Sequence, residues 1–290
     1  MAQGIVCLTF DFDAISLWLA NDMRSPASLS RGEFGAVAVP RILTALAERH
    51  ISSSWFIPGS TIDTFPERCR EVVAAGHEVG LHGYVHERVG DLTEHTERDI
   101  FRRAYDAVGN LTGHTPVGNR TPSWDFSPYT VDIMLDLGLR YDSSLMGNDY
   151  TPFRCRTGDT VSPDGKMTFG RATDLIELPV SWSLDDFPHF EYFSTPRYLL
   201  PGLRAAGDVF GNWRDDIAYM QRDFDEGVAV VTFHPQVIGR GHRLLGLERW
   251  LDELIRMGIR FERCDHVAAR VATGHLYGRY APHADAPATV

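Results

Sequence analysis

The chain has 290 residues, of which 43% are hydrophobic, so it can bury one large core and we expect a single domain over residues 1–290. Its 28 basic and 39 acidic residues give a net charge of -11, which argues against nucleic acid or an anionic membrane as a partner. No apolar stretch is long enough to span a bilayer and no charged leader precedes the first apolar run, so we expect a cytoplasmic protein.

The first elements alternate between strand and helix. Residues 4–10 are apolar almost throughout, which predicts a strand that is covered on both faces and ends at Asp11. Residues 16–36 show no clear period and contain proline and glycine, so we expect an irregular insertion that could overhang a site. Apolar residues at helical spacing over 39–46, followed by the strand-like run 53–57, then predict a helix and a second strand.

The same alternation continues toward the end of the chain. We expect helices over 66–76, 93–108, 130–137 and 245–255, and strands over 77–82, 140–143, 175–180, 227–234 and 259–262, with a short strand ending at Arg120. Roughly seven strands alternating with helices imply parallel pairing, and no glycine-rich phosphate loop follows the first strand. The sequence therefore predicts a distorted or incomplete (β/α) barrel of about seven parallel strands, with a flexible tail over 282–290.

Reactive side chains follow several of the predicted strands. Those at carboxyl ends of strands are Asp11, Asp13, His82, Arg120 and His234. His82 and His86 are four residues apart, a spacing that suits two metal-binding imidazoles. Taken alone, chance is the plainer explanation of this pair, and a solvated turn or helix cap is the plainer explanation of Asp11 and Asp13. In a parallel barrel all strand ends meet on one face, which is where such barrels place their active sites. We therefore expect one site at this face.

Four motifs resemble those of the polysaccharide deacetylase (NodB-homology) family, also grouped as carbohydrate esterase family 4. They are the segments TFDFD at 9–13, HGYVH at 82–86, RTPSW at 120–124 and FHP at 233–235. The resemblance implies the distorted (β/α) barrel of that family. The family usually has two adjacent aspartates, whereas Phe12 separates them here, which resembles a bacterial intracellular branch with peptidoglycan-deacetylase-like and allantoinase-like members.

The resemblance also implies roles for individual residues. Asp13, His82 and His86 match the metal ligands, Asp11 the catalytic base, Arg120 the arginine that orients it, and His234 the catalytic acid. One divalent metal ion is implied, with zinc as the first choice and cobalt, nickel or iron also suited to two nitrogens and one oxygen. The open position of such a site can acidify a water and polarise a carbonyl.

Weaker candidates complete the predicted site. Tyr84, Trp124, Trp182 and Asp186 could line a substrate pocket, although ordinary packing explains each aromatic residue equally well. Asp185 and Asp186 are also candidates for the acidic group that orients the catalytic histidine, and an exposed acidic turn is the plainer interpretation of the pair.

The predicted activity is hydrolysis of a non-peptide C–N bond, with removal of an acetyl group from an N-acetylated sugar or polysaccharide as the first choice. The alternative is ring opening of a small cyclic amide or imide, which the long segments 16–36 and 144–174 could favour by roofing a small pocket. A non-haem iron oxygenase also uses two histidines and a carboxylate, but its usual framework is rich in β-strands. A non-catalytic metal-binding protein would need neither Asp11 nor His234. A homo-oligomer is compatible with all of these alternative functions.

Overall fold

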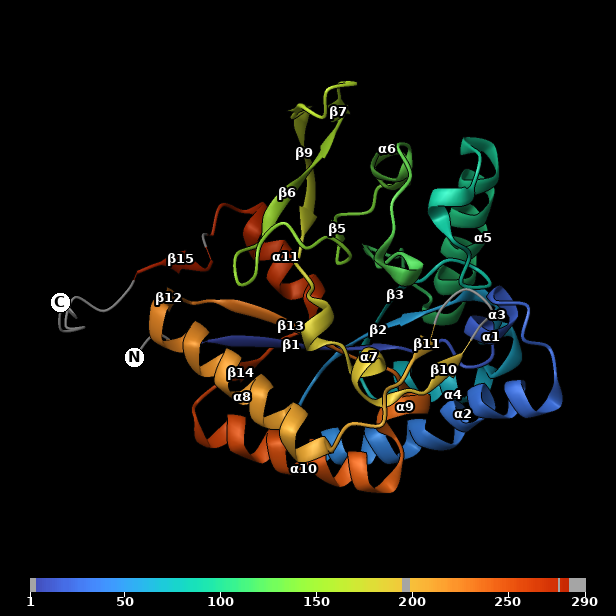
Figure 1. The fold of residues 1–290 in the computed structure, drawn as a ribbon, viewed down its shortest axis with the longest axis vertical. Helices are drawn as coiled ribbons and strands as arrows, with labels where there is room; N and C mark the ends of the chain where they lie inside the picture. The colour runs from blue at the N-terminus through green and yellow to red at the C-terminus, as the bar shows by residue number, and fades with distance from the viewer. Residues whose placement is uncertain (1–3, 195–198, 276, 282–290) are drawn as a thin grey trace.

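The computed structural model describes residues 4–194, 199–275 and 277–281, so the predicted tail over 282–290 lies outside the described residues. A curled, nine-stranded sheet forms the centre of the molecule (Figure 1). Its strands run in the order β13 (Val228–Phe233), β1 (Ile5–Asp11), β2 (Ser54–Ile57), β3 (Glu78–Leu81), β4 (Gly118–Asn119), β5 (Tyr141–Asp142), β9 (Arg171–Glu177) and β6 (Phe153–Thr157), and β14 (Arg260–Phe261) pairs with the start of β1.

Parallel pairing dominates this sheet. Each neighbouring pair from β13 to β9 is parallel, and β14 is parallel to β1, whereas β6 runs antiparallel to β9. Among the described strands, β13 does not pair with β9 or β6, so the sheet curls without closing. The prediction of an incomplete (β/α) barrel with about seven parallel strands is therefore confirmed.

Helices surround the sheet (Figure 1). They are α1 (Ser16–Ala20), α2 (Pro26–Ala47), α3 (Gly59–Thr64), α4 (Pro66–Ala74), α5 (Glu94–Thr112), α6 (Thr130–Asp136), α7 (Asp186–Phe190), α8 (Ala206–Asp223), α9 (Pro235–Ile238), α10 (Gly241–Arg256) and α11 (Cys264–Ala272). Short 3-10 helices are η1 (Val89–Asp91), η2 (Pro122–Trp124) and η3 (Trp182–Leu184). Three small two-stranded sheets pair β7 (Thr160–Val161) with β8 (Met167–Thr168), β10 (Phe193–Ser194) with β11 (Leu199–Leu200), and β12 (Phe224–Asp225) with β15 (Arg279–Tyr280). Within the described ranges, no helix is long and apolar enough to cross a membrane.

The central strand β1 is buried along its whole length, as its apolar sequence predicts. Its even-numbered residues Val6, Leu8 and Phe10 join the large apolar cluster that includes residues of α2 and α10. Its odd-numbered residues, from Ile5 to Asp11, face the other side of the sheet, because successive side chains of a strand point in opposite directions. Because of this alternation, the two polar residues at the end of this row, Thr9 and Asp11, face the site described below.

The prediction of an irregular insertion over 16–36 is wrong, because α1 and the first half of α2 occupy most of it. Helix α2 begins at Pro26, and the side chain of Ser25 accepts a hydrogen bond from the backbone N–H of Ser28 at 3.2 Å. The glycines within α2 allow close packing against neighbouring residues and do not mark a loop. A Cβ at Gly32 would lie 2.4 Å from the carbonyl oxygen of Ala14, so only glycine lets the helix approach the chain after β1 so closely.

Candidate metal and catalytic site

The carboxyl ends of four parallel strands bring the predicted site residues together. Asp11 ends β1, His82 follows β3, Arg120 follows β4 and His234 follows β13. Asp13 lies two residues after β1, so its carboxylate continues the same side of the chain as that of Asp11. The predicted meeting of these side chains on one face is therefore seen in the structure.

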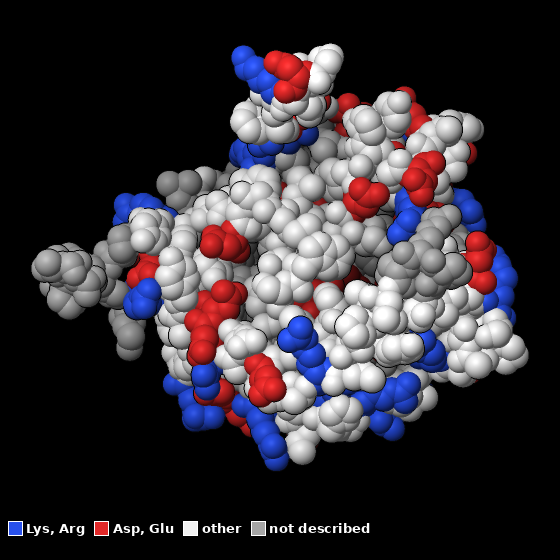
Figure 2. All heavy atoms as spheres, viewed as in Figure 1, with Lys and Arg blue, Asp and Glu red and all other residues white. Residues whose placement is uncertain are grey.

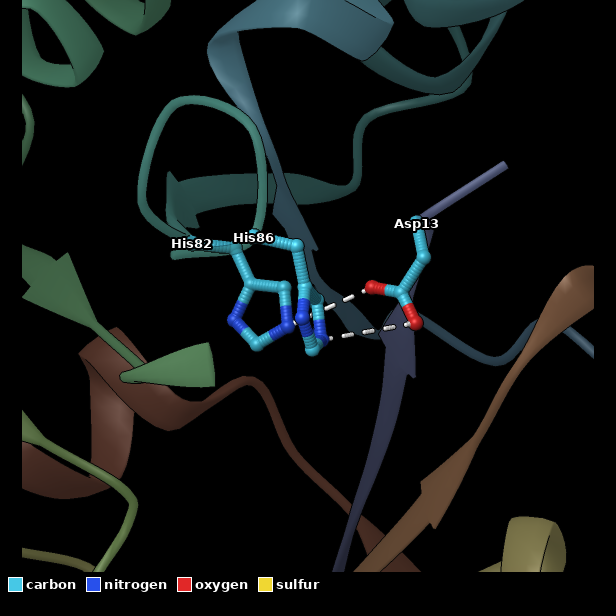
Figure 3. Close-up of side chains that lie close together, drawn as sticks. All are labelled: Asp13, His82 and His86. Atoms are coloured by element: carbon cyan, nitrogen blue, oxygen red, sulfur yellow. Dashed lines mark ion pairs between the residues drawn. The ribbon is translucent and has the colours of Figure 1, made fainter. Parts of the chain in front are cut away.

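Asp13, His82 and His86 form a compact triad (Figure 3). The Nε2 atom of His82 lies 3.3 Å from Asp13 Oδ1, and that of His86 lies 3.8 Å from Asp13 Oδ2. All three side chains are buried. Both carboxylate oxygens of Asp13 lack a hydrogen-bond donor among the described residues, a state that is costly for a buried carboxylate unless a cation neutralises it.

The loop between the two histidines is held in an unusual backbone shape. Gly83 has φ of +63° and His86 has φ of 59°, both in the left-handed region. The carboxylate of Glu87 accepts hydrogen bonds from the backbone N–H groups of Tyr84 and Val85, at 2.9 and 2.8 Å. Glu87 thus fixes the turn that returns His86 toward the side of His82.

The protonation of the triad suits a cation. Burial alone would raise the pKa of Asp13, but the neighbouring imidazoles of His86, His82 and His234 outweigh burial and lower it to about 2. Burial lowers the pKa of His86 to about 4 despite the opposing effect of Asp13, so this imidazole is neutral at neutral pH. Burial alone would lower the pKa of His82, but Asp11 and Asp13 outweigh burial and raise it. The Nδ1 of His82 donates to the carbonyl oxygen of Arg120 at 2.8 Å, so Nε2 is the ring nitrogen that faces Asp13.

Arg120 is fully buried and all of its nitrogens are engaged. Its Nη1 donates to Asp11 Oδ1 at 2.8 Å and to the hydroxyl of Thr9 at 2.7 Å. Its Nε and Nη2 donate to the carbonyl and the hydroxyl oxygen of Ser143, and its guanidinium lies over the ring of Phe56. The pairing of Arg120 with Asp11 leaves the second oxygen of Asp11 for other partners. No sequence pattern singled out Thr9 or Ser143 for this role.

His234 belongs to a second acidic group. Its Nδ1 lies 2.8 Å from Asp186 Oδ1 and 3.5 Å from Asp185 Oδ1, while its Nε2 faces Asp13 at 3.7 Å. Burial alone would lower the pKa of His234, but Asp185 and the hydrogen-bonded Asp186 outweigh burial and raise it well above its ordinary value. Both aspartates are buried, so the interpretation as an exposed acidic turn is wrong.

A cavity of about 360 Å³ opens above these groups. Figure 2 shows this face hollowed, with acidic atoms in its depth. Asp11, Asp13 and Asp185 line the cavity, and its wall includes the rings of Trp124 and Trp182, which stack with centroids 4.2 Å apart. The two tryptophans therefore lie where pocket residues were predicted.

Two other predicted pocket residues lie elsewhere. The hydroxyl of Tyr84 donates to Asp63, and its ring packs against the guanidinium of Arg103, so its side chain is directed away from the cavity. Asp186 is fully buried behind His234 and does not line the cavity. Both assignments to the pocket are wrong because the direction of a side chain depends on tertiary contacts that the motifs do not encode.

The long segments expected to roof the pocket contribute little to it. Segment 144–174 contains β6, β7, β8 and the start of β9, and these strands project away from the body of the molecule (Figure 1). None of its residues lines the cavity, and Leu17 is the only described residue of segment 16–36 that does. The expectation that these two segments roof the pocket is therefore not met by 144–174 and is met by 16–36 only at Leu17.

Comparison with known proteins connects this site to a family. The family model described as polysaccharide deacetylase matches residues 2–141. A peptidoglycan deacetylase from Helicobacter pylori is 35% identical over 284 residues, which cover 92% of this chain and 96% of that protein. The chain belongs to the polysaccharide deacetylase family. The resemblance seen in the four motifs is therefore confirmed, and membership makes the chain a hydrolase that acts on amide C–N bonds.

Solved structures share the polysaccharide deacetylase fold. A Mycobacterium smegmatis protein assigned to the polysaccharide deacetylases has 31% identity and a TM-score of 0.83, covering 97% of this chain and 93% of that one. An allantoinase has 21% identity and a TM-score of 0.74, covering 94% and 92%, a likeness that concerns the fold alone. A peptidoglycan deacetylase-like protein from Gibberella zeae is 29% identical and covers 86% of this chain and 80% of that protein.

Proposed function

We propose that this polysaccharide deacetylase family member removes the acetyl group from an N-acetylated amino sugar of an oligosaccharide or polysaccharide. The observation that carries the proposal is the meeting, at one cavity, of the triad Asp13, His82 and His86 with a second carboxylate, Asp11, and a histidine acid, His234. The Helicobacter pylori relative is named a peptidoglycan deacetylase, which supports a glycan substrate.

The triad residues fit one divalent metal ion. One ligand atom from each of Asp13, His82 and His86 lies within 4.8 Å of the other two, and both carboxylate oxygens of Asp13 have no hydrogen-bond partner among the described residues. Two imidazoles and one carboxylate suit zinc, and also cobalt, nickel or iron, and we propose zinc. When bound, the ion would polarise the amide carbonyl as a Lewis acid and make a water more acidic.

Asp11 is proposed to accept the proton of the attacking water. Its Oδ1 is held by Arg120 at 2.8 Å, and its Oδ2 lies 3.9 Å from His82 Nε2. Arg120 thereby keeps the carboxylate in one orientation through a charge-assisted hydrogen bond. The proton therefore moves to a carboxylate that is already aligned with the cavity.

His234 is proposed to protonate the departing nitrogen. Its Nδ1 proton is donated to Asp186 Oδ1, so the ring is fixed and Nε2 is the atom that faces the cavity. The raised pKa keeps the imidazolium available at neutral pH, which a proton donor requires. Loss of the amine from the tetrahedral intermediate then needs no proton from bulk water.

The substrate is proposed to be a glycan and not a small cyclic amide. Trp182 is 45% exposed at the cavity, and its ring stacks on that of Trp124, which offers an apolar surface to one face of a sugar ring. No residue of 144–174 lines the described cavity wall, so the segment expected to roof a small cyclic substrate does not do so.

The test is a comparison of substrates with the metal-loaded protein. We expect acetate release from N-acetylglucosamine oligomers when zinc, cobalt or nickel is added, and no ring opening of cyclic ureides. Ring opening without acetate release would favour the alternative activity. Inactivity on all of these amides with metal bound would contradict both.

We also infer that the described chain forms a single domain, because β1 near the amino terminus pairs with both β13 and β14 near the other end. The expected cytoplasmic location and homo-oligomer stay predictions.

A further inference from the structure

Arg88 differs from the other charged residues around the candidate cavity. Of the described lysines and arginines it alone lines the cavity, whose other ionisable wall residues are aspartates and histidines: Asp11, Asp13, Asp185, His82, His86 and His234. Arg88 is exposed, and its side chain forms no ion pair, hydrogen bond or ring contact within the described part of the chain. Its guanidinium is therefore free to bind a ligand at the mouth of the cavity.

The backbone that carries Arg88 is fixed on both sides. The preceding residue, Glu87, accepts two backbone hydrogen bonds from the loop between the histidines. The following residue, Val89, is buried, and Gly90 donates its backbone N–H to Asp125 at 3.2 Å. Because this backbone is already anchored, a ligand that binds the Arg88 side chain has to order only the side chain and not the loop.

We propose that Arg88 recognises a carboxylate on the substrate, so that the chain prefers an N-acetylated amino sugar linked to an acidic sugar over a neutral glycan. This inference rests on the proposed function. A guanidinium offers a planar pair of N–H donors that matches the two oxygens of a carboxylate. The acetyl-bearing amide has to reach the triad in the depth of the cavity, so an acidic group on the neighbouring sugar would lie nearer the mouth, where the exposed Arg88 lines the wall.

The test compares two substrates that differ in one charge. One is the disaccharide of N-acetylglucosamine and N-acetylmuramic acid, which carries a lactyl carboxylate, and the other is its neutral methylamide. For the wild-type chain we expect KM for the methylamide to exceed KM for the acid by about three- to tenfold, as for a charge-assisted contact near solvent. The ratio should shrink as salt is added, because exposed charges are screened.

Variants then assign the preference to the side chain. In Arg88→Gln the ratio of the two KM values should fall to about one, and Arg88→Lys should keep part of it because the charge is retained. Arg256→Gln is the matched control, because Arg256 is an exposed arginine in the last turn of α10 that does not line the cavity, and it should keep the wild-type ratio.

The outcomes separate the two proposals. Acetate release from both substrates with equal KM, or an unchanged ratio in Arg88→Gln, would overturn the role of Arg88 and leave the proposed deacetylation intact. No acetate release from either substrate or from N-acetylglucosamine oligomers, with metal bound, would overturn both.

Discussion

The buried carboxylate of Asp13 has two oxygens that no donor in the described chain satisfies, and two imidazole nitrogens face them. We expect Asp13→Asn to lower zinc affinity by more than about 100-fold. Loss of a residue that only hydrogen-bonds a metal ligand typically lowers metal affinity about 10- to 100-fold, and Asp13 is proposed to be a ligand itself. Equilibrium dialysis with metal analysis would measure this. Asp174→Asn, at an exposed carboxylate of β9, is the control and should bind zinc as the wild type does.

A second prediction concerns the proton on His234. Its proposed role is that of an acid, so activity should fall as pH rises through its pKa, which Asp185 and Asp186 keep high. Asp186→Asn removes one of these negative charges and lowers that pKa. The alkaline limb of the kcat/KM profile should therefore move to lower pH. An alkaline limb at its wild-type position would contradict the assignment of His234 as the acid.

Part of this site could be predicted from residues alone, and part could not. The meeting of Asp11, Asp13, His82 and Arg120 on one face follows from their places at strand ends, because a parallel barrel brings such ends together. Their roles as metal ligands, base and orienting arginine came from the resemblance of the motifs to those of the family. The partner of His234 could be narrowed only to two neighbouring aspartates, since Asp186 is 48 residues away in sequence and its contact depends on how α7 packs. The direction of the Tyr84 side chain could not be predicted for the same reason, because it depends on contacts with Asp63 and Arg103.

At the scale of elements, the turn between β3 and η1 determines whether the two histidines face each other. A Cβ at Gly83 would lie 2.9 Å from Pro122 Cγ and 3.0 Å from Glu87 Oε2, and its φ of +63° is unfavourable for alanine. We expect Gly83→Ala to lower zinc affinity and to destabilise the fold by more than about 1–2 kcal/mol, the usual range for a left-handed residue alone. Metal titration and thermal unfolding would measure the two effects.

Gly76 provides the matched control for this prediction. It has φ of +81°, but a Cβ there would meet nothing within 4 Å. Gly76→Ala should therefore destabilise the fold by about 1–2 kcal/mol through φ alone and leave zinc affinity unchanged. Equal loss of zinc affinity in both variants would show that the Gly83 contacts do not position the histidines.

Elements were predicted best where the apolar pattern was strong. The buried strands β1 and β13, and helices with clear caps such as α5, lie close to their expected ranges, because continuous apolar runs and helical spacing report burial directly. Helix α2 was recognised only in its second half. Its first half contains glycines that allow close packing, and from the sequence alone such glycines resemble those of a loop.

At the scale of the whole molecule, a buried acidic pair in the barrel affects stability. Burial raises the pKa of Asp142 to about 6, and burial together with Asp142 raises that of Glu177 well above its usual value. Folding therefore favours the protonated forms. The stability that these groups contribute is present at low pH and is lost as pH rises from about 4 through about 6 and beyond.

Replacement of one member should reduce this loss. Glu177→Gln keeps an oxygen that can accept from the backbone N–H groups of Ser144 and Leu145, but it removes the second acid. We expect the free energy of unfolding of the variant, relative to wild type, to increase between pH 5 and pH 8 by on the order of 1 kcal/mol. Urea unfolding at the two pH values would measure it, with Glu48→Gln at an exposed glutamate as the control. A difference that does not change with pH would contradict the pairing.

In the proposed reaction, the metal triad and a separate base, Asp11, act together on an N-acetyl group. A substitution at Asp11 separates loss of the base from loss of the metal. The measurement is acetate release from N-acetylglucosamine oligomers by zinc-loaded wild type and Asp11→Asn, with bound zinc determined on the same samples. We expect equal zinc content and a kcat lower by about 100-fold or more in the variant, the usual effect of losing a general base. Wild-type kcat in Asp11→Asn, with the same zinc content, would contradict the role of Asp11 as the base.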